Sequence, residues 1–437
     1  MAKFNKSVAA LVLNFGKHPF HQGSLGAIRS LGSVGIPVFA IQPSRLIPSG
    51  ASRYLKRKFY WKTDGKNPGE FLERMASVAR VLDRPTVLVP TDDLSAILIA
   101  ENAGYLPPLF CFPRSPANLP RSLANKRELY ELCRRLEIAC PATVFPESAE
   151  EFRDFAAQAH LPAVVKAINP WLAPPWVRST ALVWERKKLI NYCEDRQVPA
   201  TSVMIQEMIP APASQDWFVH GYCDRRSNPV VAFTGIKLRS YPPLAGPTTF
   251  GCAVRNDFLR QQALDLVKAI AYQGALDLDY KFDKRDGRYK LLDFNPRLGA
   301  QFRLFRTAEG TDVVRAMHLD LTGHAPEYGA QVEGRTFASE LHDLLAAWAH
   351  LRRGDLTWSE WWRSIRAIDE TAWYSAKDPL PFLLMCLHMP ARALTRHAQH
   401  WRLKGAPEIT LGTRVLPTVE EGERNPGGWG HEARRAG

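Results

Sequence analysis

The sequence is poor in cysteine: its 437 residues include only seven, and no two of them stand in a Cys-x-x-Cys spacing. An odd, scattered set of this kind argues against a disulfide framework and gives no zinc-finger spacing. We therefore expect reduced thiols in a cytosol-like compartment, which predicts a cytoplasmic protein. The cysteines are Cys111, Cys133, Cys140, Cys193, Cys223, Cys252 and Cys386.

Long hydrophobic runs are also missing. No segment reaches the roughly 18 apolar residues of a membrane span, and the N-terminal run before Asn14 is too short for a signal peptide. The nearest approach is PLPFLLMCLHMPARALTRH, residues 379–397, which Pro390 interrupts. We expect a buried helix here; the alternative is contact of residues 379–404 with a membrane surface, which would make the protein membrane-peripheral.

Negative charge is scarcer than positive charge, and the formal net charge is +13. Such a balance attracts anions, including nucleotides and anionic lipids, without identifying one. The sequence has no basic helix with interleaved aromatic residues and no recognisable RNA-binding motif, so we expect no nucleic acid partner. Hydrophobic and charged fractions of 46% and 23% are ordinary and indicate a globular chain, long enough for two or three domains.

The first part of the chain alternates apolar strand-like runs with helical patterns. The runs at 7–13, 36–42 and 86–91 predict buried strands, and Asp92 or Asp93 is expected to cap the helix after the third one. Strand, turn, helix and strand in this order form a βαβ unit. We therefore predict an open parallel sheet.

The turn after the first strand carries Gly16, Gly23 and Gly26, without the spacing of a dinucleotide fingerprint. Ligand binding on one side, and tight turning with close packing on the other, are equal alternatives for these glycines. Residues 1–115 are expected to form a Rossmann-like α/β domain.

The middle of the chain has a different pattern. Its alternating strands predict a mostly antiparallel sheet, so an α+β domain should follow the first domain. We expect it at 116–330, with a small subdomain at 116–200 and a large subdomain at 201–330. Residues 331–437 are Trp-rich and helical in pattern, which predicts a helical C-terminal extension with a flexible tail. Strands are expected at 161–168, 202–209, 217–224, 229–239, 276–283 and 288–295.

The last two of these strands form a hairpin that gathers polar side chains. Because strand side chains face alternate sides, Leu292 and Phe294 should fill one face. On the other face, carboxylate and amide oxygens suit Mg²⁺ that arrives with a nucleotide's phosphates; a solvated face with ordinary surface acids is an equal alternative. The residues of the polar face are Asp277, Asp279, Lys281, Asp293, Asn295 and Arg297, with Asp279 opposite Asp293.

The sequence DFNPR, residues 293–297, resembles the metal-binding hairpin of the ATP-grasp superfamily, the fold of D-alanine:D-alanine ligase, biotin carboxylase and carbamoyl phosphate synthetase. In that family the second metal strand ends in Glu-x-Asn-Pro-Arg. Here Asp293 replaces the Glu, and Asp279 takes the place of the first metal acid. The resemblance implies that Asp279, Asp293 and Asn295 bind Mg²⁺, with Mn²⁺ as an alternative.

Two lysines extend the resemblance. Lys126 in LANKRELY stands where the family has its first phosphate-contacting lysine, and Lys166 in LPAVVKAI stands where it has the second. Lysines supply compact positive charges to phosphates. The resemblance therefore implies that both lysines bind the α and β phosphates of ATP.

The resemblance also assigns an adenine site. QEMI, residues 206–209, is similar to the linker between the two ATP-grasp subdomains, where backbone groups near Glu207 and Ile209 would hydrogen-bond the adenine edge. Asp216 would hold the ribose hydroxyls. The full nucleotide-binding set adds Lys126 and Lys166 to Gln206, Glu207, Met208, Ile209 and Asp216.

A basic pair precedes a loop rich in Pro and Gly. Lys237 and Arg239 are two positions apart, which predicts one strand face, and such a pair suits a γ-phosphate or a substrate carboxylate. Ligase-like ATP-grasp members, including the predicted carboxylate-amine ligases, carry a basic strand and a similar loop here. With Arg297, this pair makes up the expected catalytic set.

One segment departs from the family pattern. The loop after Lys166 reads NPWLAPPWVRST, residues 169–180, with three prolines and no glycine, whereas the family has a glycine-rich lid over the phosphates. Proline removes a donor and fixes φ. The lid is therefore expected to be stiffer or differently shaped, or to act through Arg178, Ser179 and Thr180.

The resemblance covers residues 5–330 and implies a pre-ATP-grasp α/β domain before an ATP-grasp domain. It predicts an ADP-forming ligase that uses ATP and Mg²⁺ to activate a carboxylate as an acyl phosphate and to join it to an amine or a thiol. Small-molecule carboxylates and amines would be its partners, as in the D-aspartate ligases. The alternatives are a catalytically reduced ATP-binding scaffold or sensor and a membrane-peripheral assembly protein. Cys252 and His220 are expected to be structural.

Overall fold

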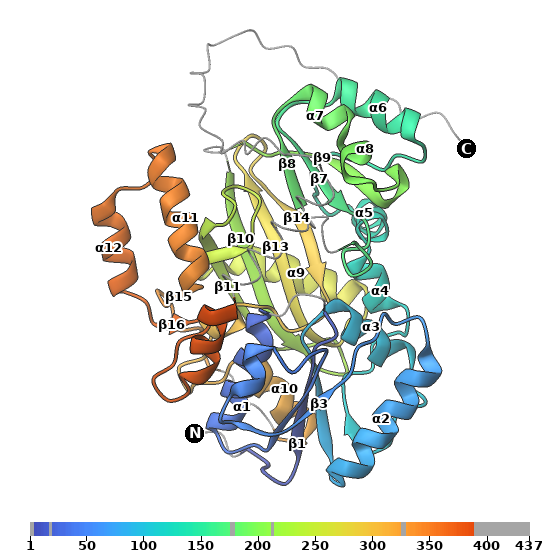
Figure 1. Ribbon diagram of the computed structural model, residues 1–437, viewed down its shortest axis with the longest axis vertical. Coiled ribbons are helices and arrows are strands. Elements are labelled where there is room, and N and C mark those ends of the chain that lie inside the picture. Colours follow the sequence, from blue (N-terminus) through green and yellow to red (C-terminus); the bar gives the residue numbers. More distant parts are fainter. Residues whose placement is uncertain (1–3, 17–19, 175–179, 211–213, 325–328, 389–437) are drawn as a thin grey trace.

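The computed structural model describes residues 4–16, 20–174, 180–210, 214–324 and 329–388, which form three sheets and the helices around them (Figure 1). Arg178 and Ser179 of the expected lid lie outside these residues, as do positions 389–404 of the segment considered for membrane contact. The part of that segment at 380–388 is helical. Met385 of this helix is buried, while Leu380 and Leu387 are exposed, so the expectation of a buried helix holds for one side only.

The first sheet is parallel throughout, with the strand order β3-β2-β1-β4-β5. Its central strand AALVL is buried along its whole length, as both faces of a parallel sheet are covered. This confirms the expected open α/β architecture. The strands are β1 (Ala9–Leu13), β2 (Val38–Gln42), β3 (Leu55–Tyr60), β4 (Thr86–Pro90) and β5 (Phe110–Cys111), and the helices are α1 (Gln22–Ser33), η1 (Pro48–Ala51), α2 (Pro68–Leu82) and α3 (Asp93–Glu101). Asp92 is the residue that caps α3, since its carboxylate accepts from the Ser95 N–H.

The second sheet is small and antiparallel, in the order β6-β9-β7-β8. Ser148 caps the helix that precedes β7, and its side chain accepts from the Glu151 N–H. The strands are β6 (Thr143–Val144), β7 (Ala163–Ala167), β8 (Thr180–Val183) and β9 (Val203–Glu207). The helices are α4 (Leu119–Ala124), α5 (Lys126–Arg135), α6 (Ala149–Gln158), α7 (Arg186–Ile190), α8 (Tyr192–Arg196) and η2 (Ala200–Ser202).

The third sheet is the largest, in the order β14-β13-β10-β11-β12-β15-β16, and only its β15–β16 pair is parallel. Its strands are β10 (Ser214–Cys223), β11 (Pro229–Ser240), β12 (Thr248–Ala253), β13 (Gly274–Asp283), β14 (Arg288–Asn295), β15 (Thr336–Ala338) and β16 (Glu370–Thr371). The helices are α9 (Asp257–Ala269), η3 (Phe302–Leu304), α10 (Val313–Leu321), α11 (Glu340–Arg353) and α12 (Trp358–Arg366). The C-terminal region therefore adds two short strands to this sheet as well as the expected helices.

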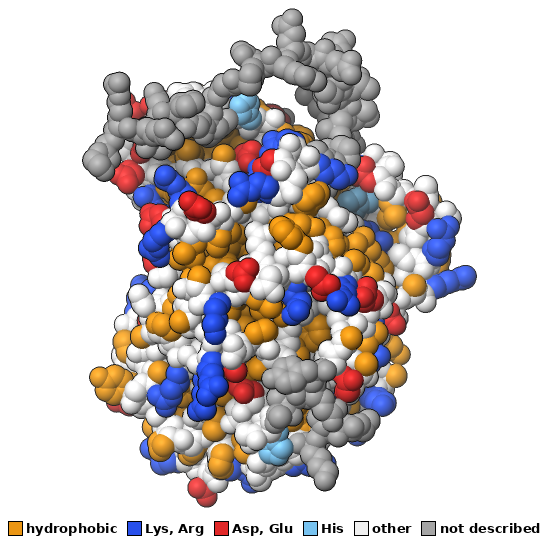
Figure 2. All heavy atoms as spheres, turned by 180° about the vertical axis from the view of Figure 1, so that it is seen from behind, with side chains coloured by type: hydrophobic (Ala, Val, Ile, Leu, Met, Phe, Trp, Pro, Cys, Tyr) orange, Lys and Arg blue, Asp and Glu red, His pale blue; other side chains and the backbone are white. Residues whose placement is uncertain are grey.

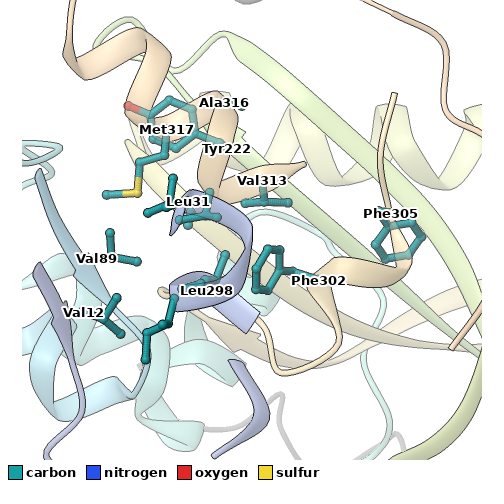
Figure 3. Close-up of a cluster of buried hydrophobic side chains, with 14 of the residues drawn as sticks. Val12, Leu31, Val89, Tyr222, Leu298, Phe302, Phe305, Val313, Ala316 and Met317 are labelled. Carbon is teal, nitrogen blue, oxygen red and sulfur yellow. The ribbon is translucent and has the colours of Figure 1, made fainter. Parts of the chain in front are cut away.

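One hydrophobic cluster joins the first sheet to the third (Figure 3). Val12 and Val89 of the parallel sheet lie near Leu298 and Phe302, which follow β14, and α10 contributes further apolar side chains. The loop after β14 is thereby packed between the two sheets. Because this loop follows the polar hairpin directly, the first sheet helps to position the hairpin.

The C-terminal region is also fastened to the first sheet by polar contacts. The buried carboxylate of Asp378 accepts from Arg29 Nε at 3.0 Å, from Ser52 Oγ at 2.7 Å and from the Arg53 N–H at 2.9 Å. Arg29 and Asp378 are both almost fully buried. Breaking a pair of this kind leaves an uncompensated charge in the interior.

On the face seen in Figure 2, Lys and Arg side chains are interspersed with Asp and Glu side chains, so the positive net charge forms no single continuous basic field there. Among the described residues, no helix combines the length and the apolar character needed to cross a bilayer.

Candidate active site

The hairpin of β13 and β14 has the register predicted for its acids. Asp279 pairs with Asp293, and Asp277 pairs with Asn295. The register then shifts, so that Tyr280 pairs with Leu291 and Leu292 becomes the extra residue of a bulge. Phe294 fills the core beneath α9 as predicted. Leu292 instead lines a narrow cavity between the second and third sheets, because the bulge removes it from the regular alternation.

Two lysines from other elements meet the carboxylate of Asp293. Lys126 Nζ lies 2.6 Å from Asp293 Oδ1, and Lys166 Nζ lies 3.5 Å from Asp293 Oδ2. Lys166 Nζ also donates to the Leu292 carbonyl at 3.4 Å. The lysines that the sequence places 40 positions apart therefore converge on one acid of the predicted metal set.

Local structure explains how the two lysines come together. Asn125 caps α5, accepting from the N–H groups of Arg127 and Glu128, and this fixes Lys126 as the first residue of the helix. The Lys126 N–H donates to the carbonyl of Ile168, just beyond β7, at 3.0 Å. The start of α5 is thus tied to the end of the strand that carries Lys166.

The two facing acids of the hairpin differ in their electrostatics. Burial opposes ionisation of Asp293, but the positive charges of Lys126 and Lys166 overcome it and lower its pKa to about 2. Burial raises the pKa of Asp279 to about 6, because Lys237 only partly offsets burial and the repulsion from Asp277 and Asp293. Asp293 is therefore charged at any working pH, whereas Asp279 titrates just below neutrality.

Lys237 of β11 belongs to the same charged cluster. Burial disfavours its charge, but the carboxylates of Asp279 and Asp216 outweigh burial and raise its pKa. Its Nζ atom lies 3.5 Å from the Gly246 carbonyl, in the loop after β11. Lys237 is therefore within electrostatic reach of both hairpin acids, and its expected role at a γ-phosphate or a substrate carboxylate stays a prediction.

Arg239 lies elsewhere, and the prediction that it shares a strand face with Lys237 is wrong. Lys237 pairs with Gly251 and Arg239 pairs with Phe250, so a bulge at Leu238 places the two side chains on opposite faces. The Arg239 guanidinium makes two hydrogen bonds to the buried carboxylate of Asp343 in α11, at 2.8 and 2.7 Å. A one-residue insertion in the strand thus turns Arg239 away from the hairpin.

Arg297 joins the hairpin to the first domain. Its Nη1 lies 2.7 Å from Asp277 Oδ2, and its Nε lies 3.4 Å from Asp93 Oδ1. Asn295 donates to the Asp277 carbonyl at 3.1 Å. The contact between Asp93 and Arg297 was not predicted from the sequence. Two acids stand in a row shortly after β4, and only Asp92 is needed as the helix cap. The second acid could therefore have been considered for a role in the site.

His220 is fully buried beside Asp277, with its Nε2 at 3.3 Å from Asp277 Oδ1. Burial lowers its pKa to about 3, so the imidazole is neutral. The glycine at 299 makes room for it: a Cβ there would lie 2.0 Å from His220 Cε1. His220 therefore packs under the loop that carries Arg297.

The residues predicted to bind the base lie at the end of β9. Gln206 is buried and donates to Thr143 Oγ1 at 2.9 Å, while Ile209 is buried and Met208 is half-buried beyond the strand. The cavity beside them, lined by Lys126, Gln206 and Leu292, has a volume of about 20 Å³. Room for about one water is too little for a purine, so adenine binding here requires these side chains to move.

The side chains of Glu207 and Asp216 are both engaged by bases. Glu207 lies 3.3 Å from Arg285 and 3.7 Å from Lys290, and its own N–H donates to the Ala142 carbonyl. Asp216 lies 3.0 Å from Lys281 Nζ. The sequence analysis gave no role to Lys281 of β13, Lys290 of β14 or Arg285 in the turn between these strands. Alternation along β13 does put Lys281 on the same face as Asp279.

The donor set suits a hard cation. Asp279 and Asp293 supply carboxylate oxygens and Asn295 supplies an amide oxygen, the ligand types that Mg²⁺ takes together with phosphate and water oxygens. In the part of the chain that the structure describes, no group of three or more His, Cys, Asp and Glu side chains is arranged to hold a metal. Two acids and one amide fit an ion that a nucleotide brings in, more than a resident metal.

Comparisons with known proteins match part of this region in sequence and about three quarters of the chain in fold. Residues 247–321 match the family model described as carbamoyl-phosphate synthase L chain, ATP binding domain. Over 274 residues the chain is 25% identical to the D-aspartate ligase of Enterococcus faecium (strain Aus0004), a match that covers 59% of this chain and 64% of that ligase. The chain thus spans less than two thirds of the length of this relative.

Solved structures resemble the fold at lower identity. An N5-carboxyaminoimidazole synthetase from Staphylococcus aureus, complexed with ADP, has a TM-score of 0.57 at 10% identity. The match covers 77% of this chain and 82% of the synthetase chain. An L-amino acid ligase from Bacillus licheniformis has a TM-score of 0.53 at 13% identity and covers 73% of this chain and 75% of its own. At these identities the likeness shows the fold.

Proposed function

We propose that this chain, a member of the ATP-grasp superfamily, is an ATP-dependent, ADP-forming ligase that joins a carboxylate to an amine or a thiol. The observation that carries the proposal is the meeting of Lys126 and Lys166 with Asp293, from three separate elements, at one point. A basic pair and an acid held together in this way can neutralise a polyphosphate and its counter-ion at the same place.

The nucleotide would lie between the second and third sheets. We assign Lys126 and Lys166 to its phosphates, and Gln206 to Ile209 to the adenine. Asp216 is assigned to the ribose hydroxyls, in exchange for its present contact with Lys281. Lys126 and Gln206 line the same narrow cavity, which supports this placement, and their side chains would have to move because about 20 Å³ does not hold a purine.

Asp279, Asp293 and Asn295 are assigned to Mg²⁺. When bound, the ion would neutralise phosphate oxygens beside the hairpin. Asp293 is already ionised there, since its two lysines lower its pKa to about 2, and Asp279 becomes ionised above about pH 6. The chain therefore holds two negative ligands at neutral pH.

The reaction needs positioning and charge neutralisation rather than a protein nucleophile. A carboxylate oxygen of the first substrate attacks the γ-phosphorus, the bond to the β–γ bridging oxygen breaks, and ADP leaves with that electron pair. The amine nitrogen then attacks the acyl carbon, inorganic phosphate leaves, and the amine proton passes to solvent. Lys237 and Arg297 are assigned to the charge that develops on the transferring group.

Amino acids are the first substrates to test, because the Enterococcus relative is named a D-aspartate ligase. The experiment is a screen for release of ADP and phosphate, with ATP, Mg²⁺ and pairs drawn from amino acids, other carboxylates and amines. The proposal requires that release depend on both a carboxylate and an acceptor. ATP binding without any release across the panel would contradict it.

A second candidate is an ATP-binding scaffold or sensor that has lost catalysis. It is favoured by the glycine-free segment 169–180, and by the internal pairing of Lys126, Lys166 and Arg297, which all have carboxylate partners. A nucleotide that binds with micromolar affinity and is recovered intact after long incubation with the full substrate panel would support this function.

A further inference from the structure

A second cavity lies where helix α1 meets the elements around the third sheet, away from the polar hairpin. α1 approaches the hairpin loop at its N-terminal end, where a Cβ on Gly23 would lie 3.1 Å from the Gly299 carbonyl. At the other end of α1, from Arg29 to Ser33, the helix borders a cavity of about 250 Å³. The other walls of the cavity come from η3, the start of α10, β16 and the segment before Asp378. Neither of the two lysines assigned to the ATP phosphates lines it.

Basic side chains dominate the walls of this cavity, which we call the arginine cavity. Six bases line it, against two acids, Asp312 and Glu370. Arg306 and Lys377 are exposed and lie at its mouth, whereas Arg29 and Arg335 are buried. The six bases are Arg29, Arg303, Arg306, Arg315, Arg335 and Lys377.

Asp378, which lies outside the lining, neutralises Arg29, but together with the two acids of the wall it does not balance six bases. Glu370 Oε1 lies 2.5 Å from Arg303 Nη2, and Glu370 Oε2 lies 3.7 Å from Arg335 Nη2. Asp312 accepts from Ser30 Oγ and from the Arg315 N–H, as the cap of α10. The guanidinium of Arg315 donates instead to the carbonyls of Gly310 and Ser30. One carboxylate therefore serves two of the arginines, and the other acts mainly as a helix cap.

Two guanidinium nitrogens of the cavity are left over. Arg29 Nη1 and Arg303 Nη1 are both buried and have no hydrogen-bond partner among the described residues. The whole Arg29 residue is only 3% exposed. A buried charged donor without a partner costs free energy that an acceptor at this position would recover. Burial lowers the pKa of Arg29 even though Asp378 opposes this shift, and the nearby charge of Arg303 lowers it further. Both observations point to a missing negative group.

We propose that the arginine cavity binds a small oxyanion ligand with two or more negative charges, carried by phosphate or carboxylate groups. The planar guanidinium fork matches both groups by paired hydrogen bonds. A volume of about 250 Å³ suits a compact metabolite.

This site is separate from the proposed ATP site but adjoins it. Phe305 lines the arginine cavity, and its ring centroid lies 5.3 Å from that of His220, which contacts Asp277 beneath the hairpin. Binding at the arginine cavity does not require ligase activity, because the charge and burial of the cavity alone support it.

The test is calorimetric titration of the full chain with inorganic phosphate and, separately, with succinate, each at an ionic strength held constant with chloride. We expect saturable binding of at least one probe. Arg303→Gln and Arg306→Gln should each weaken it by roughly tenfold, and Glu370→Gln should strengthen it, since that acid competes for the same guanidinium groups. Arg153→Gln, an exposed base on α6, is the matched control and should bind like the parent.

Lys166→Gln separates this site from the lysine pair assigned to ATP, and should leave the binding in place. Binding of phosphate alone would identify a phosphate ligand, and binding of succinate alone a carboxylate ligand. The proposal is overturned if neither probe binds, or if Lys166→Gln abolishes binding that Arg303→Gln does not change. Should Arg303→Gln fail to fold by circular dichroism, Arg306→Gln, which alters an exposed side chain at the cavity mouth, replaces it in both comparisons.

Discussion

Asp279 and Asp293 stand directly opposite each other on β13 and β14, yet the pKa of Asp279 is raised to about 6 and that of Asp293 is lowered to about 2. The difference arises because Lys126 and Lys166 both contact Asp293. The hairpin thus combines one acid that is always charged with one that gains its charge as the pH approaches neutrality.

Asp293→Asn should lower kcat/KM for ATP on the order of a hundredfold, because the change removes a proposed metal ligand and leaves two lysines without their acid. The measurement is the initial rate of ADP release with the best substrate pair from the screen. Asp265→Asn, the same exchange at an exposed position of α9, should be unchanged. Normal turnover in Asp293→Asn would disprove our assignment of the hairpin.

Mg²⁺ dependence should vary with pH through Asp279. Below about pH 6 its carboxyl is protonated in the folded chain, so the apparent affinity for Mg²⁺ is expected to fall by about tenfold per pH unit there and to level off above pH 7. His220 does not contribute, since its pKa is lowered to about 3. Mg²⁺ titrations of turnover between pH 5 and 8 measure this, and an identical pH profile in Asp279→Asn would exclude Asp279 as the cause.

The ionised carboxylate of Asp279 should destabilise the folded chain at neutral pH. Its folded pKa of about 6 lies above the ordinary 3.8, so the folded state binds more protons and its stability falls as the pH rises from about 4 through 6. Asp279→Asn should therefore exceed the parent in free energy of unfolding by about 3 kcal/mol at pH 8, with no gain at pH 4. Urea unfolding at both pH values tests this; a gain of equal size at pH 4 would mean that charge is not the reason.

Arg239→Met should destabilise the fold by about 3–5 kcal/mol, because it leaves the carboxylate of Asp343 buried and unpaired. Adding Asp343→Leu should restore most of the loss, since a buried pair can be replaced by apolar residues. Arg255→Met, in an exposed pair with Asp257, is the control and should change stability little. If the double variant unfolds as easily as Arg239→Met in urea, the pair is not what stabilises this strand.

Gly299→Ala should destabilise the chain by about 1–3 kcal/mol, as the new Cβ would overlap the His220 ring. Gly104→Ala has open space around its Cβ and is the matched control. His220→Ala, combined with Gly299→Ala, should recover part of the loss by making room. Thermal unfolding of the four proteins provides the comparison, and equal melting temperatures for both glycine variants would refute this account of the packing.

Much of the fold could be predicted because its signals are local. A period of two along β13 and β14, with a short turn between them, was enough to pair Asp279 with Asp293. Helix caps are equally local, and Asp92, one of the two acids predicted to cap the helix after the third strand, does cap it. The roles of the site residues stay predictions, since they require a ligand.

The misses have physical causes that local patterns do not carry. A single inserted residue at Leu238 reverses the face of Arg239, and its partner Asp343 lies 104 positions away. The contact between Asp93 and Arg297 likewise depends on how two sheets pack. Strands as short as β15 and β16 contain too few residues to show any alternation.

The carboxylate of Asp378 gives the C-terminal region a part in the whole molecule. Since it holds Arg29, Ser52 and Arg53 of the first domain, a chain cut after residue 330 would strand a buried guanidinium without its counter-charge. A chain shortened to residues 1–330 should consequently give insoluble material. In the full chain, the first sheet and the C-terminal region should unfold together in one cooperative step.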